Sequence, residues 1–420
     1  MKAERPGGNA GMVDGGRLWR RLFELAEIGR SGSGGVTRLS LTDEERSAKD
    51  LVASYMEEAG LAVREDAVGN LFGRREGRDA EAPAVLVGSH VDSVYSGGDF
   101  DGPLGVLAGI EVVQVMEENG VLTDHPVEVV AFTDEEGARF SFGMIGSRAL
   151  AGHLSSGDLE HTDGDGLSVA LAMREYGLDP DQVGDARRGQ GSLAAYLELH
   201  IEQGRVLEAE DLPAGIVTGI AGPVWLRFSL RGESGHAGAT PMNRRHDALA
   251  AAAEIVGAVE EEASSTPSAV GTVGQIEARP GGLHIIPGGV DLSVDLRDID
   301  VAARDGVEGR IRERAEEDCA RRGVELGIEE LQRLDPAPCS EEVRSVISGA
   351  CEELGIRPHS LPSGAGHDGM HLASLCPMGM IFVRSKNGIS HNPEEWSSKE
   401  DCEAGCNVLY RSVLGLAGRG

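Results

Sequence analysis

Histidine and acidic residues stand in short segments whose spacing suits metal binding. His90 and Asp92 end an apolar run two residues apart, so their side chains leave an extended strand on the same side. Asp92 can therefore stand behind His90 and fix its imidazole while the ring ligates a metal ion. Asp101 follows in the segment DFDG, where its carboxylate could lie between two cations. This pattern predicts a histidine ligand, its supporting carboxylate and a carboxylate bridge.

Two adjacent glutamates follow the next apolar run, in the segment TDEEG. Adjacent residues leaving a strand point in opposite directions, so Glu136 can ligate a metal ion while Glu135 faces a bound water. Two more histidines follow predicted strands, His200 in ELHIEQG and His391 in GISHNP. We predict that one ion binds His90, Asp101 and His200, and that a second ion binds Asp101, Glu136 and His391.

This set of nitrogen and oxygen ligands predicts two divalent cations of zinc, manganese, cobalt or nickel. Two such ions roughly 3.5–4 Å apart lower the pKa of a bridging water and polarise the carbonyl that it attacks. With Glu135 as the general base, no serine or cysteine nucleophile is required. The predicted reaction is the hydrolysis of an amide or urea-type C–N bond in a small molecule.

The composition limits the partners and the compartment. A formal net charge of −31 over 420 residues disfavours nucleic acid and anionic membrane surfaces, because phosphate groups attract basic patches. No apolar run approaches the roughly 20 residues of a membrane span. The opening stretch MKAERPGGNAGMVDGG lacks the apolar middle of a signal peptide. We therefore expect a cytoplasmic protein without a membrane partner.

The six cysteines form no C-x-x-C pair and fit a reducing compartment. Cys402 and Cys406 stand one helical turn apart and could share a metal ion. They lack a nearby histidine or third cysteine, so we interpret them as ordinary helix residues. The chain is long enough to bury a substantial core without disulfides.

Periodicity places the acidic motifs at the carboxyl ends of buried strands. Apolar runs at residues 83–89 and 127–133 predict two strands, and the pattern of residues 105–120 predicts a helix between them. Helical patterns also cover residues 18–28 and the stretch from Thr42, whose TDEE start looks like a capping box. Continuous apolar strands are typical of a parallel sheet covered on both faces, and ligands collect at the carboxyl ends of such strands.

From about Ala214 the pattern changes to alternating strands with two helices, which predicts a separate α+β insert. The expected strands cover residues 224–230, 270–275 and 290–296, and the helices cover residues 247–263 and 301–322. The apolar strand pattern returns at residues 380–383. The predicted fold class is α/β, with a mostly parallel-sheet catalytic domain of residues 16–212 and 334–420, an inserted domain of residues 213–333 and a disordered tail of residues 1–15.

The chain after residue 15 resembles a family of metallopeptidase-like amidohydrolases that comprises N-carbamoyl-L-amino-acid hydrolases, allantoate amidohydrolases and β-ureidopropionases. The segments that carry the resemblance are GSHVDSVYSGGDFDGPLGVLAGIEVV, AFTDEEGARFSFGMIGSR, ELHIEQGRVLE, GHAGATPMNRRHDALAAAAEI, VGTVG, SVDLRD, SGAGHDG and GMIFVRSKNGISHNPEEW. The resemblance implies a catalytic domain with two metal ions per subunit and the ligand roles given above. It also implies that the inserted domain is a lid and the interface of a homodimer.

The resemblance further assigns residues to the substrate. It implies that Gln203 contacts the carbamoyl or ureido group and that His236, in GHAG, stabilises the oxyanion from the lid. Arg297, in DLRD, would clamp the substrate carboxylate, because a planar guanidinium binds a carboxylate through two hydrogen bonds. The backbone of Gly366 would bind the same carboxylate, and His367 would support the pocket.

One position departs from the family pattern. In PGGLHIIPGG the family usually has asparagine where this chain has His284, at a place expected to touch the substrate. A histidine can still donate one hydrogen bond. We therefore expect a changed substrate preference rather than a lost activity.

We expect an enzyme that hydrolyses N-carbamoyl-L-amino acids to the L-amino acid, ammonia and carbon dioxide. Allantoate or another ureido acid is the alternative substrate. A dipeptide fits less well, because Gln203 suits a ureido nitrogen and offers nothing to a peptide amine. A catalytically inactive dimeric binding protein is a third hypothesis, and the presence of all five ligand residues together with Glu135 argues against it.

Overall fold

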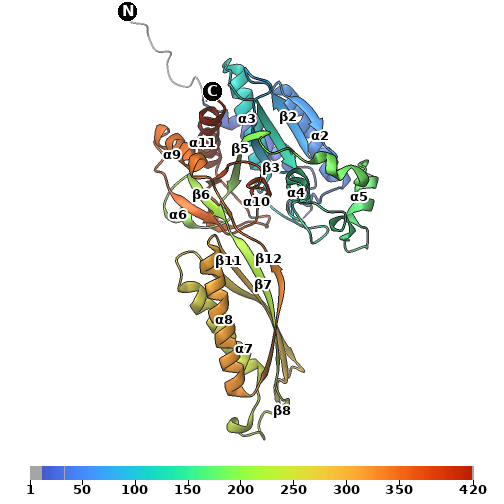
Figure 1. The fold of residues 1–420 in the computed structure, drawn as a ribbon, viewed down its shortest axis with the longest axis vertical. Coiled ribbons are helices and arrows are strands. Elements are labelled where there is room, and N and C mark those ends of the chain that lie inside the picture. The colour runs from blue at the N-terminus through green and yellow to red at the C-terminus, as the bar shows by residue number, and fades with distance from the viewer. Residues whose placement is uncertain (1–11, 33, 419–420) are drawn as a thin grey trace, which may run out of the picture. The chain divides into compact units, whose positions relative to one another are not determined.

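The computed structural model describes residues 12–32 and 34–418 and divides the chain into two units (Figure 1). The first unit runs to Thr218 and resumes over Cys339–Ser363 and from His367 onward. The second unit consists of Gly219–Pro338 together with Gly364–Gly366. The division falls later than residues 212 and 333, because strand β6 (Ala214–Ile220) still pairs with the first sheet beyond the expected boundary.

The start of the chain differs from the expected tail over residues 1–15. Residues 1–11 lie outside the described part. Val13 is buried, and its N–H donates to the Asn407 side chain at 3.1 Å. Asp14 accepts hydrogen bonds from the first backbone N–H groups of α1 (Gly15–Ala26). The prediction of a disordered tail was therefore wrong for residues 13–15, because a helix cap and a contact to the last helix hold them.

A mixed sheet of nine described strands has the order β1-β2-β4-β3-β5-β15-β6-β13, with β14 beside β6, and all of it except β13 and the end of β6 belongs to the first unit. The four strands β4, β3, β5 and β15 are parallel neighbours, whereas the strands on either side pair antiparallel. The remaining bounds are β1 (Ala62–Glu65), β2 (Leu71–Arg75), β3 (Ala84–His90), β4 (Val127–Phe132), β5 (Leu193–Ile201), β13 (Ala337–Pro338), β14 (Ser360–Ser363) and β15 (Met378–Val383). The predicted α/β fold with a parallel sheet is confirmed in these central strands.

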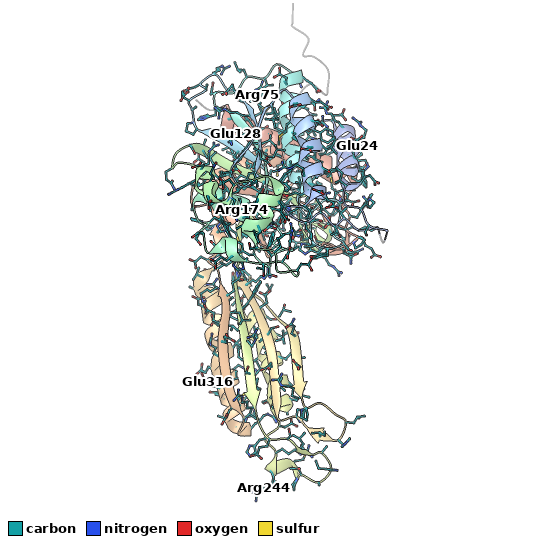
Figure 2. The ribbon with its side chains drawn as sticks, turned by 90° about the vertical axis from the view of Figure 1, so that its right-hand side faces the viewer. Glu24, Arg75, Glu128, Arg174, Arg244 and Glu316 are labelled. Atoms are coloured by element: carbon teal, nitrogen blue, oxygen red, sulfur yellow. The ribbon has the colours of Figure 1, made fainter. Side chains whose placement is uncertain are left out.

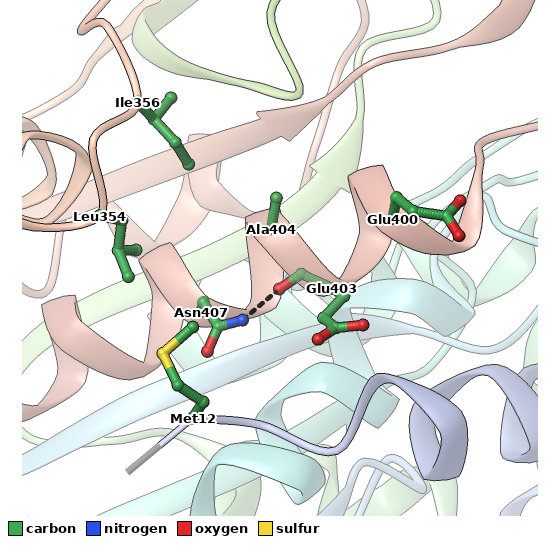
Figure 3. A pocket seen from close by; sticks show the side chains of 7 residues that line it. All are labelled: Met12, Leu354, Ile356, Glu400, Glu403, Ala404 and Asn407. Atoms are coloured by element: carbon green, nitrogen blue, oxygen red, sulfur yellow. Dashed lines mark hydrogen bonds between the residues drawn. The ribbon is translucent and has the colours of Figure 1, made fainter. Parts of the chain in front are cut away.

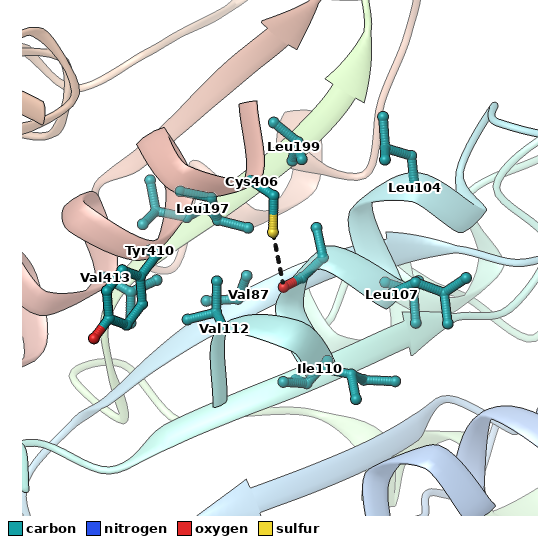
Figure 4. Close-up of a cluster of buried hydrophobic side chains, with 14 of the residues drawn as sticks. Val87, Leu104, Leu107, Ile110, Val112, Leu197, Leu199, Cys406, Tyr410 and Val413 are labelled. Carbon is teal, nitrogen blue, oxygen red and sulfur yellow. Dashed lines mark hydrogen bonds between the residues drawn. The ribbon is translucent and has the colours of Figure 1, made fainter. Parts of the chain in front are cut away.

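Helices pack against this sheet and bury its apolar strands. The helices of the first unit that follow α1 are α2 (Asp43–Glu58), α3 (Pro103–Glu118), α4 (Ile145–Ala151), α5 (Val169–Tyr176), α6 (Val206–Ala209), α9 (Glu341–Glu353), α10 (Gly369–Leu372) and α11 (Lys399–Ala417), with short 3-10 turns η1 (Asp158–Glu160), η2 (Pro180–Ala186) and η4 (Lys386–Gly388). Thr42 caps α2 as predicted, accepting a hydrogen bond from the Glu45 N–H. Figure 4 shows α3 and α11 meeting in the core, where the Cys406 thiol donates to the Ala108 carbonyl at 3.7 Å.

The second unit is an antiparallel sheet with two helices, as its alternating sequence predicts. The strands β12 (Glu325–Arg333), β7 (Gly222–Arg231), β11 (Gly289–Asp298) and β9 (Val270–Arg279) pair in that order, and β8 (Gly235–His236) pairs with β10 (Ile285–Ile286). Every second residue of β11 is buried, and these residues pack with α7 (Ala248–Ser264) and α8 (Val301–Arg322). The alternation of strand β12 was not predicted. Figure 2 labels the exposed Glu316 on α8 and Arg244 in the turn η3 (Met242–Arg244).

The described residues bear on two further expectations from the sequence, which concern the cysteines and membrane-spanning helices. The six cysteines are all buried and unpaired, so Cys402 and Cys406 are helix residues of α11. No helix within residues 12–32 and 34–418 combines the length and the apolarity that crossing a bilayer requires.

Candidate metal centre

The parallel strands bring the predicted ligands to one edge of the first sheet. His90 is the last residue of β3, and its register partner on the neighbouring β4 is Phe132. Glu135 and Glu136 follow directly after β4, and His200 lies near the end of β5. Because β4, β3 and β5 are consecutive neighbours that end at the same edge, side chains distant in sequence meet there.

The first predicted cluster of ligands is assembled in the structure. The Nε2 atom of His200 lies 3.1 Å from Oδ1 of Asp101, and the Nε2 atom of His90 lies 3.6 Å from the same oxygen. One ligand atom from each of these three buried residues lies within 4.8 Å of the other two. Such a set is the size of a metal coordination shell.

The second predicted cluster uses the other oxygen of the same carboxylate. The Nε2 atom of His391 lies 3.3 Å from Oδ2 of Asp101 and 3.5 Å from Oε2 of Glu136. Oδ1 of Asp101 therefore lies near His90 and His200, whereas Oδ2 lies near His391. This is the geometry of a carboxylate shared between two ions.

The protonation of the two buried imidazoles fits a cation. The Nδ1 atom of His90 lies 3.1 Å from the Asp92 carbonyl, and that of His200 lies 2.9 Å from the Ile201 carbonyl. A carbonyl oxygen only accepts, so each Nδ1 carries a proton and Nε2 is the ring nitrogen that faces the carboxylates. Both buried Nε2 atoms lack a hydrogen-bond partner in the protein. Ring nitrogens that face carboxylates without a hydrogen bond to them are placed where a divalent ion would bind between the two groups.

Asp92 contacts the backbone of Glu135 and Glu136 in addition to the His90 imidazole. Its Oδ1 lies 3.5 Å from the Nδ1 of His90 and accepts from the Glu135 N–H at 3.2 Å. Its Oδ2 accepts from the Glu136 N–H at 3.1 Å. One buried carboxylate thus fixes the ends of β3 and β4 together. Oε2 of Glu135 lies 3.6 Å from Nε2 of His90, so the predicted base faces the first cluster.

Burial and mutual repulsion perturb the carboxylates. Burial raises the pKa of Glu136 to about 7, and the charge of Asp101 adds to the rise. Burial also raises the pKa of Glu135 well above its ordinary value, and the charge of Glu136 contributes. Burial acts on Asp101 in the same direction, but the positive charge of the nearby His200 outweighs it and holds the Asp101 pKa well below its ordinary value. A divalent cation would offset this concentration of negative charge.

Three residues of this region adopt the left-handed backbone conformation that non-glycine residues avoid. Asp134, Gln203 and His391 have φ values of 56°, 58° and 54°. Each costs about 1–3 kcal/mol, and such strain concentrates at functional sites. Gly102, with φ of 82°, is required for a further reason, because a Cβ there would lie 2.4 Å from the His90 ring. The backbone at the two clusters is therefore shaped to place these side chains rather than for its own stability.

Gln203 lies beside the shared carboxylate. Its Nε2 donates to Oδ2 of Asp101 at 2.7 Å and to the Ser390 hydroxyl at 3.2 Å. Its Oε1 is buried and has no hydrogen-bond partner. An acceptor in this position is suited to an N–H group of a bound molecule.

His367 and the residues behind the clusters are buried. The ring centroids of His367 and His200 lie 4.5 Å apart, and Nε2 of His367 lies 2.9 Å from the Ser363 hydroxyl oxygen. Burial lowers the His367 pKa well below its ordinary value, so the ring is neutral. A carboxylate oxygen of Glu198 lies within 4.8 Å of a ring nitrogen of His200 and of His367, and Glu198 accepts from the Ser89 hydroxyl at 2.7 Å. These contacts hold the predicted ligand His200 in place.

Sequence reasoning missed two residues behind the site. Arg38 is fully buried, donates through Nε to the Val91 carbonyl, and thereby holds the segment between His90 and Asp92. The Ser40 hydroxyl donates to the buried Asp134 carboxylate. Arg38 stands in the segment GGVTRLSL, which carries no periodic or motif signal for burial. Only its contacts identify it.

The remaining predicted substrate residues belong to the second unit. His236 is exposed, and its Nδ1 accepts from the N–H groups of Gly238 and Ala239 at 3.1 and 3.2 Å. The His284 side chain is exposed, and its carbonyl accepts from the Ala237 N–H. Arg297 is held through Nε and Nη2 by Asp295 and donates through Nη1 to the Gly364 carbonyl at 2.7 Å, in the turn that contains Gly366.

A separate pocket in the first unit does not include any of these residues. Figure 3 shows it between Met12 and helix α11, where the Asn407 side chain donates to the Glu403 carbonyl at 2.9 Å. Leu354 and Ile356 line its apolar side. Its lining contains no histidine and no pair of convergent ligands, so it carries none of the chemistry of the clusters.

Comparisons with known proteins agree on one family. The family described as Peptidase family M20/M25/M40 matches residues 86–415. An N-carbamoyl-L-amino acid amidohydrolase of Geobacillus stearothermophilus is 60% identical over 97% of this chain and 99% of its own length. Allantoate deiminase 1 of Glycine max is 37% identical over 89% of this chain and 84% of its own length. The crystal structure of an amidase of the hydantoinase/carbamoylase family from Burkholderia multivorans matches with a TM-score of 0.93 and 39% identity, covering 98% of this chain and all of that one (100%).

Proposed function

The chain belongs to peptidase family M20/M25/M40, and from this premise we propose that it hydrolyses N-carbamoyl-L-amino acids to the L-amino acid, ammonia and carbon dioxide. The observation that carries the proposal is the carboxylate of Asp101, which faces two histidine-containing clusters with its two oxygens. Glu135 stands beside the first cluster. The names of the relatives agree with this reaction, and the resemblance predicted from the motifs is confirmed.

We propose that two divalent ions of zinc, manganese, cobalt or nickel bind per chain. His90, Asp101 and His200 would hold one ion, and Asp101, Glu136 and His391 the other. When bound, such ions supply a water of lowered pKa and polarise a carbonyl oxygen. The unpartnered Nε2 atoms of His90 and His200 support this assignment.

Glu135 would move the proton in this reaction. Its Oε2 faces the first cluster, and burial raises its pKa, which brings the carboxylate closer to the working range of a general base at neutral pH. It would take a proton from the attacking water and deliver it to the leaving nitrogen. Asp92, through the two backbone N–H groups at residues 135 and 136, would hold the base in place.

The proposed substrate contacts use polar groups of Gln203, His236, Arg297 and Gly366. Oε1 of Gln203 would accept a hydrogen bond from the ureido nitrogen. Because backbone N–H groups donate to Nδ1 of His236, its proton is on Nε2, where the exposed ring can donate to an oxyanion. Arg297 lies beside the turn of Gly364–Gly366, so its guanidinium and the Gly366 N–H would bind the substrate carboxylate together. His284 and His367 would be further residues that contact the substrate.

The second unit would serve as lid and dimer interface. Its edge strand β9 is mostly exposed, and it pairs on one side only among the described residues. An unpaired edge is suited to association with a second copy. We propose a cytoplasmic homodimer, and the buried, unpaired cysteines support a reducing compartment. Light scattering of the purified protein tests the dimer, because a mass of one chain would contradict it.

Allantoate is the second candidate substrate. A relative named allantoate deiminase supports it, and the exposed His284 stands where the predicted family pattern has asparagine. Because that relative is less identical to this chain than the N-carbamoyl-L-amino acid amidohydrolase is, we propose allantoate only as the second substrate.

Ammonia release by the purified protein, loaded with manganese or cobalt, tests the proposal. The substrates are N-carbamoyl-L-methionine, its D-enantiomer, allantoate and a dipeptide, whose cleavage is followed by amine release instead. Turnover of the L-carbamoyl compound alone is the expected result. Preference for allantoate would replace the substrate and keep the mechanism. Bound metal without turnover of any of the four compounds would favour the inactive binding protein.

A further inference from the structure

Glu395 is a buried carboxylate that the proposed mechanism does not use. Only 4% of the residue is exposed. Its Oε1 accepts from the backbone N–H groups of Phe100 at 2.9 Å and of Asp101 at 3.1 Å. Its Oε2 accepts from the Ser390 hydroxyl at 2.8 Å. The same hydroxyl oxygen also lies 2.8 Å from Oδ2 of Asp101. The carboxylate therefore connects the backbone of the shared ligand with the loop that carries His391.

The two clusters differ in what holds their histidines. His90 and His200 belong to β3 and β5, whose backbone is fixed by neighbouring strands on both sides. His391 lies on a loop after η4, with a strained φ of 54° and a side chain that is 50% exposed. The turn after it closes through the Glu395 N–H, which donates to the Asn392 carbonyl at 3.0 Å. The sheet does not position His391, so another contact must do so.

The loop before Asp101 is shaped around the Glu395 side chain. A Cβ added at Gly98 would lie 2.2 Å from the Glu395 carboxyl carbon. The two loops therefore approach so closely that only glycine leaves space for the carboxylate. This close approach is independent of the hydrogen bonds to Phe100 and Asp101.

Aromatic rings pack beside the same junction. Phe100 precedes Asp101 and Trp396 follows Glu395, and the centroids of their rings lie 5.7 Å apart. Trp19 of helix α1 lies 5.4 Å from Trp396 and 5.8 Å from Phe100. The packing brings the two loops together, but rings alone do not fix the direction of a carboxylate. The hydrogen bonds of Glu395 supply that direction.

We propose that Glu395 is a positioning residue for the second cluster: it fastens the His391 loop to the backbone of Asp101, so that binding of the second ion depends on it. The inference rests on the proposed two-ion function. The first ion depends on it less, because the strands hold His90 and His200. Loss of an outer partner of a metal ligand typically weakens metal binding about 10- to 100-fold.

Calorimetric titration of the metal-stripped full-length protein with Mn²⁺ tests this role. Glu395→Ala is expected to weaken the second binding event about 10- to 100-fold and to leave the first nearly unchanged. Glu395→Gln keeps a carbonyl oxygen for the two N–H groups, so it should restore most of the second event. Glu394→Gln changes the exposed neighbouring carboxylate and is the matched control. Gly98→Ala, which displaces Glu395 without removing it, should resemble Glu395→Ala.

The outcomes separate this role from general loosening and from the proposed function. Equal weakening of both binding events with a lower melting temperature would overturn the inference, as would two unweakened events in Glu395→Ala. A Glu395→Gln variant as defective as the alanine variant would also count against it. An unmodified protein that binds only one ion would instead contradict the two-ion proposal itself.

Discussion

The two units place their candidate chemistry in opposite environments. In the first unit His90, Asp92, Asp101 and Glu135 are buried, and their contacts hold them before any ion binds. In the second unit His236 and His284 are exposed, and Arg297 is half-buried against Asp295. Burial of charged groups is costly and is found where an ion or a partner compensates for it. The difference agrees with the proposal that ions bind in the first unit, whereas the proposed substrate contacts of the second unit are available to a ligand that arrives from solution.

Asp101→Ala should have the largest effect, because it removes the carboxylate shared by both clusters. We expect turnover at background and metal content below one ion per chain. Metal analysis after desalting and ammonia release measure the two effects. Asp99→Asn, which changes the carboxylate paired with Arg30, is the control and should keep both properties. Two ions retained in the Asp101→Ala protein would disprove the shared role.

Glu135→Gln should separate ion binding from turnover within the first unit. The amide cannot take a proton, so we expect kcat to fall about 10²- to 10⁴-fold while two ions stay bound. Steady-state kinetics and metal analysis on the same preparation provide the measurement. A variant with unchanged kcat would assign the base to another residue.

His236→Ala addresses the exposed donor of the second unit. We expect kcat/KM to fall about 10²- to 10³-fold, because a donor to the developing oxyanion is lost, with no change in metal content. Glu316→Ala, an exposed change on α8 of the same unit, is the control. If metal content fell together with activity, the division of roles between the units would be wrong.

Arg297→Lys should have a smaller effect that is concentrated in KM. A lysine keeps the charge but loses the planar pair of donors, so KM is expected to rise about tenfold with little change in kcat. Initial rates over a range of N-carbamoyl-L-amino acid concentrations measure it. A fall in kcat with constant KM would contradict a role in binding the carboxylate.

His371→Gln should leave activity unchanged and alter only the acid stability of the first unit. Burial, together with the charges of Arg148 and His153, lowers the His371 pKa to about 3. Protonation of His371 therefore favours the unfolded chain. The neutral imidazole contributes to stability above pH about 6.5, and this contribution is lost as the pH falls toward 3. Between pH 7 and 5 the loss amounts to about 2 kcal/mol for this group.

Urea unfolding of the metal-stripped protein at pH 7 and pH 5 checks this expectation. The free energy of unfolding should depend less on pH in His371→Gln than in the unmodified chain. Identical pH dependence in the two proteins would show that His371 is not a neutral buried group.

Much of the fold could be predicted because its signal is local. The helix expected over residues 301–322 is α8 (Val301–Arg322), and the strand expected over residues 127–133 is β4 (Val127–Phe132). Both depend on the spacing of apolar residues along one element. The strand β12 was missed, because its residues are largely exposed and its alternation carries little contrast. The disordered tail was wrong for residues 13–15, because Asn407 and the cap by Asp14 hold this segment.

The candidate site shows the same limit. His90 and Asp92 could be paired from their spacing, and the parallel strands brought Glu136 and His200 near them. The assignment of these residues as ligands stays a prediction until metal is measured. Arg38, by contrast, has no recognisable pattern, and its role at Val91 is visible only from its contacts.

The sequence by itself determined the family, the α/β class and the residue types of the site, because apolar periodicity and short motifs are carried by neighbouring residues. Only the tertiary structure decided that the two oxygens of Asp101 face different histidines and that Glu395 binds its backbone. Asp101 and Glu395 stand 294 positions apart in the chain. A contact over that separation forms when the packed sheet and helices bring two loops together, and no local pattern encodes it.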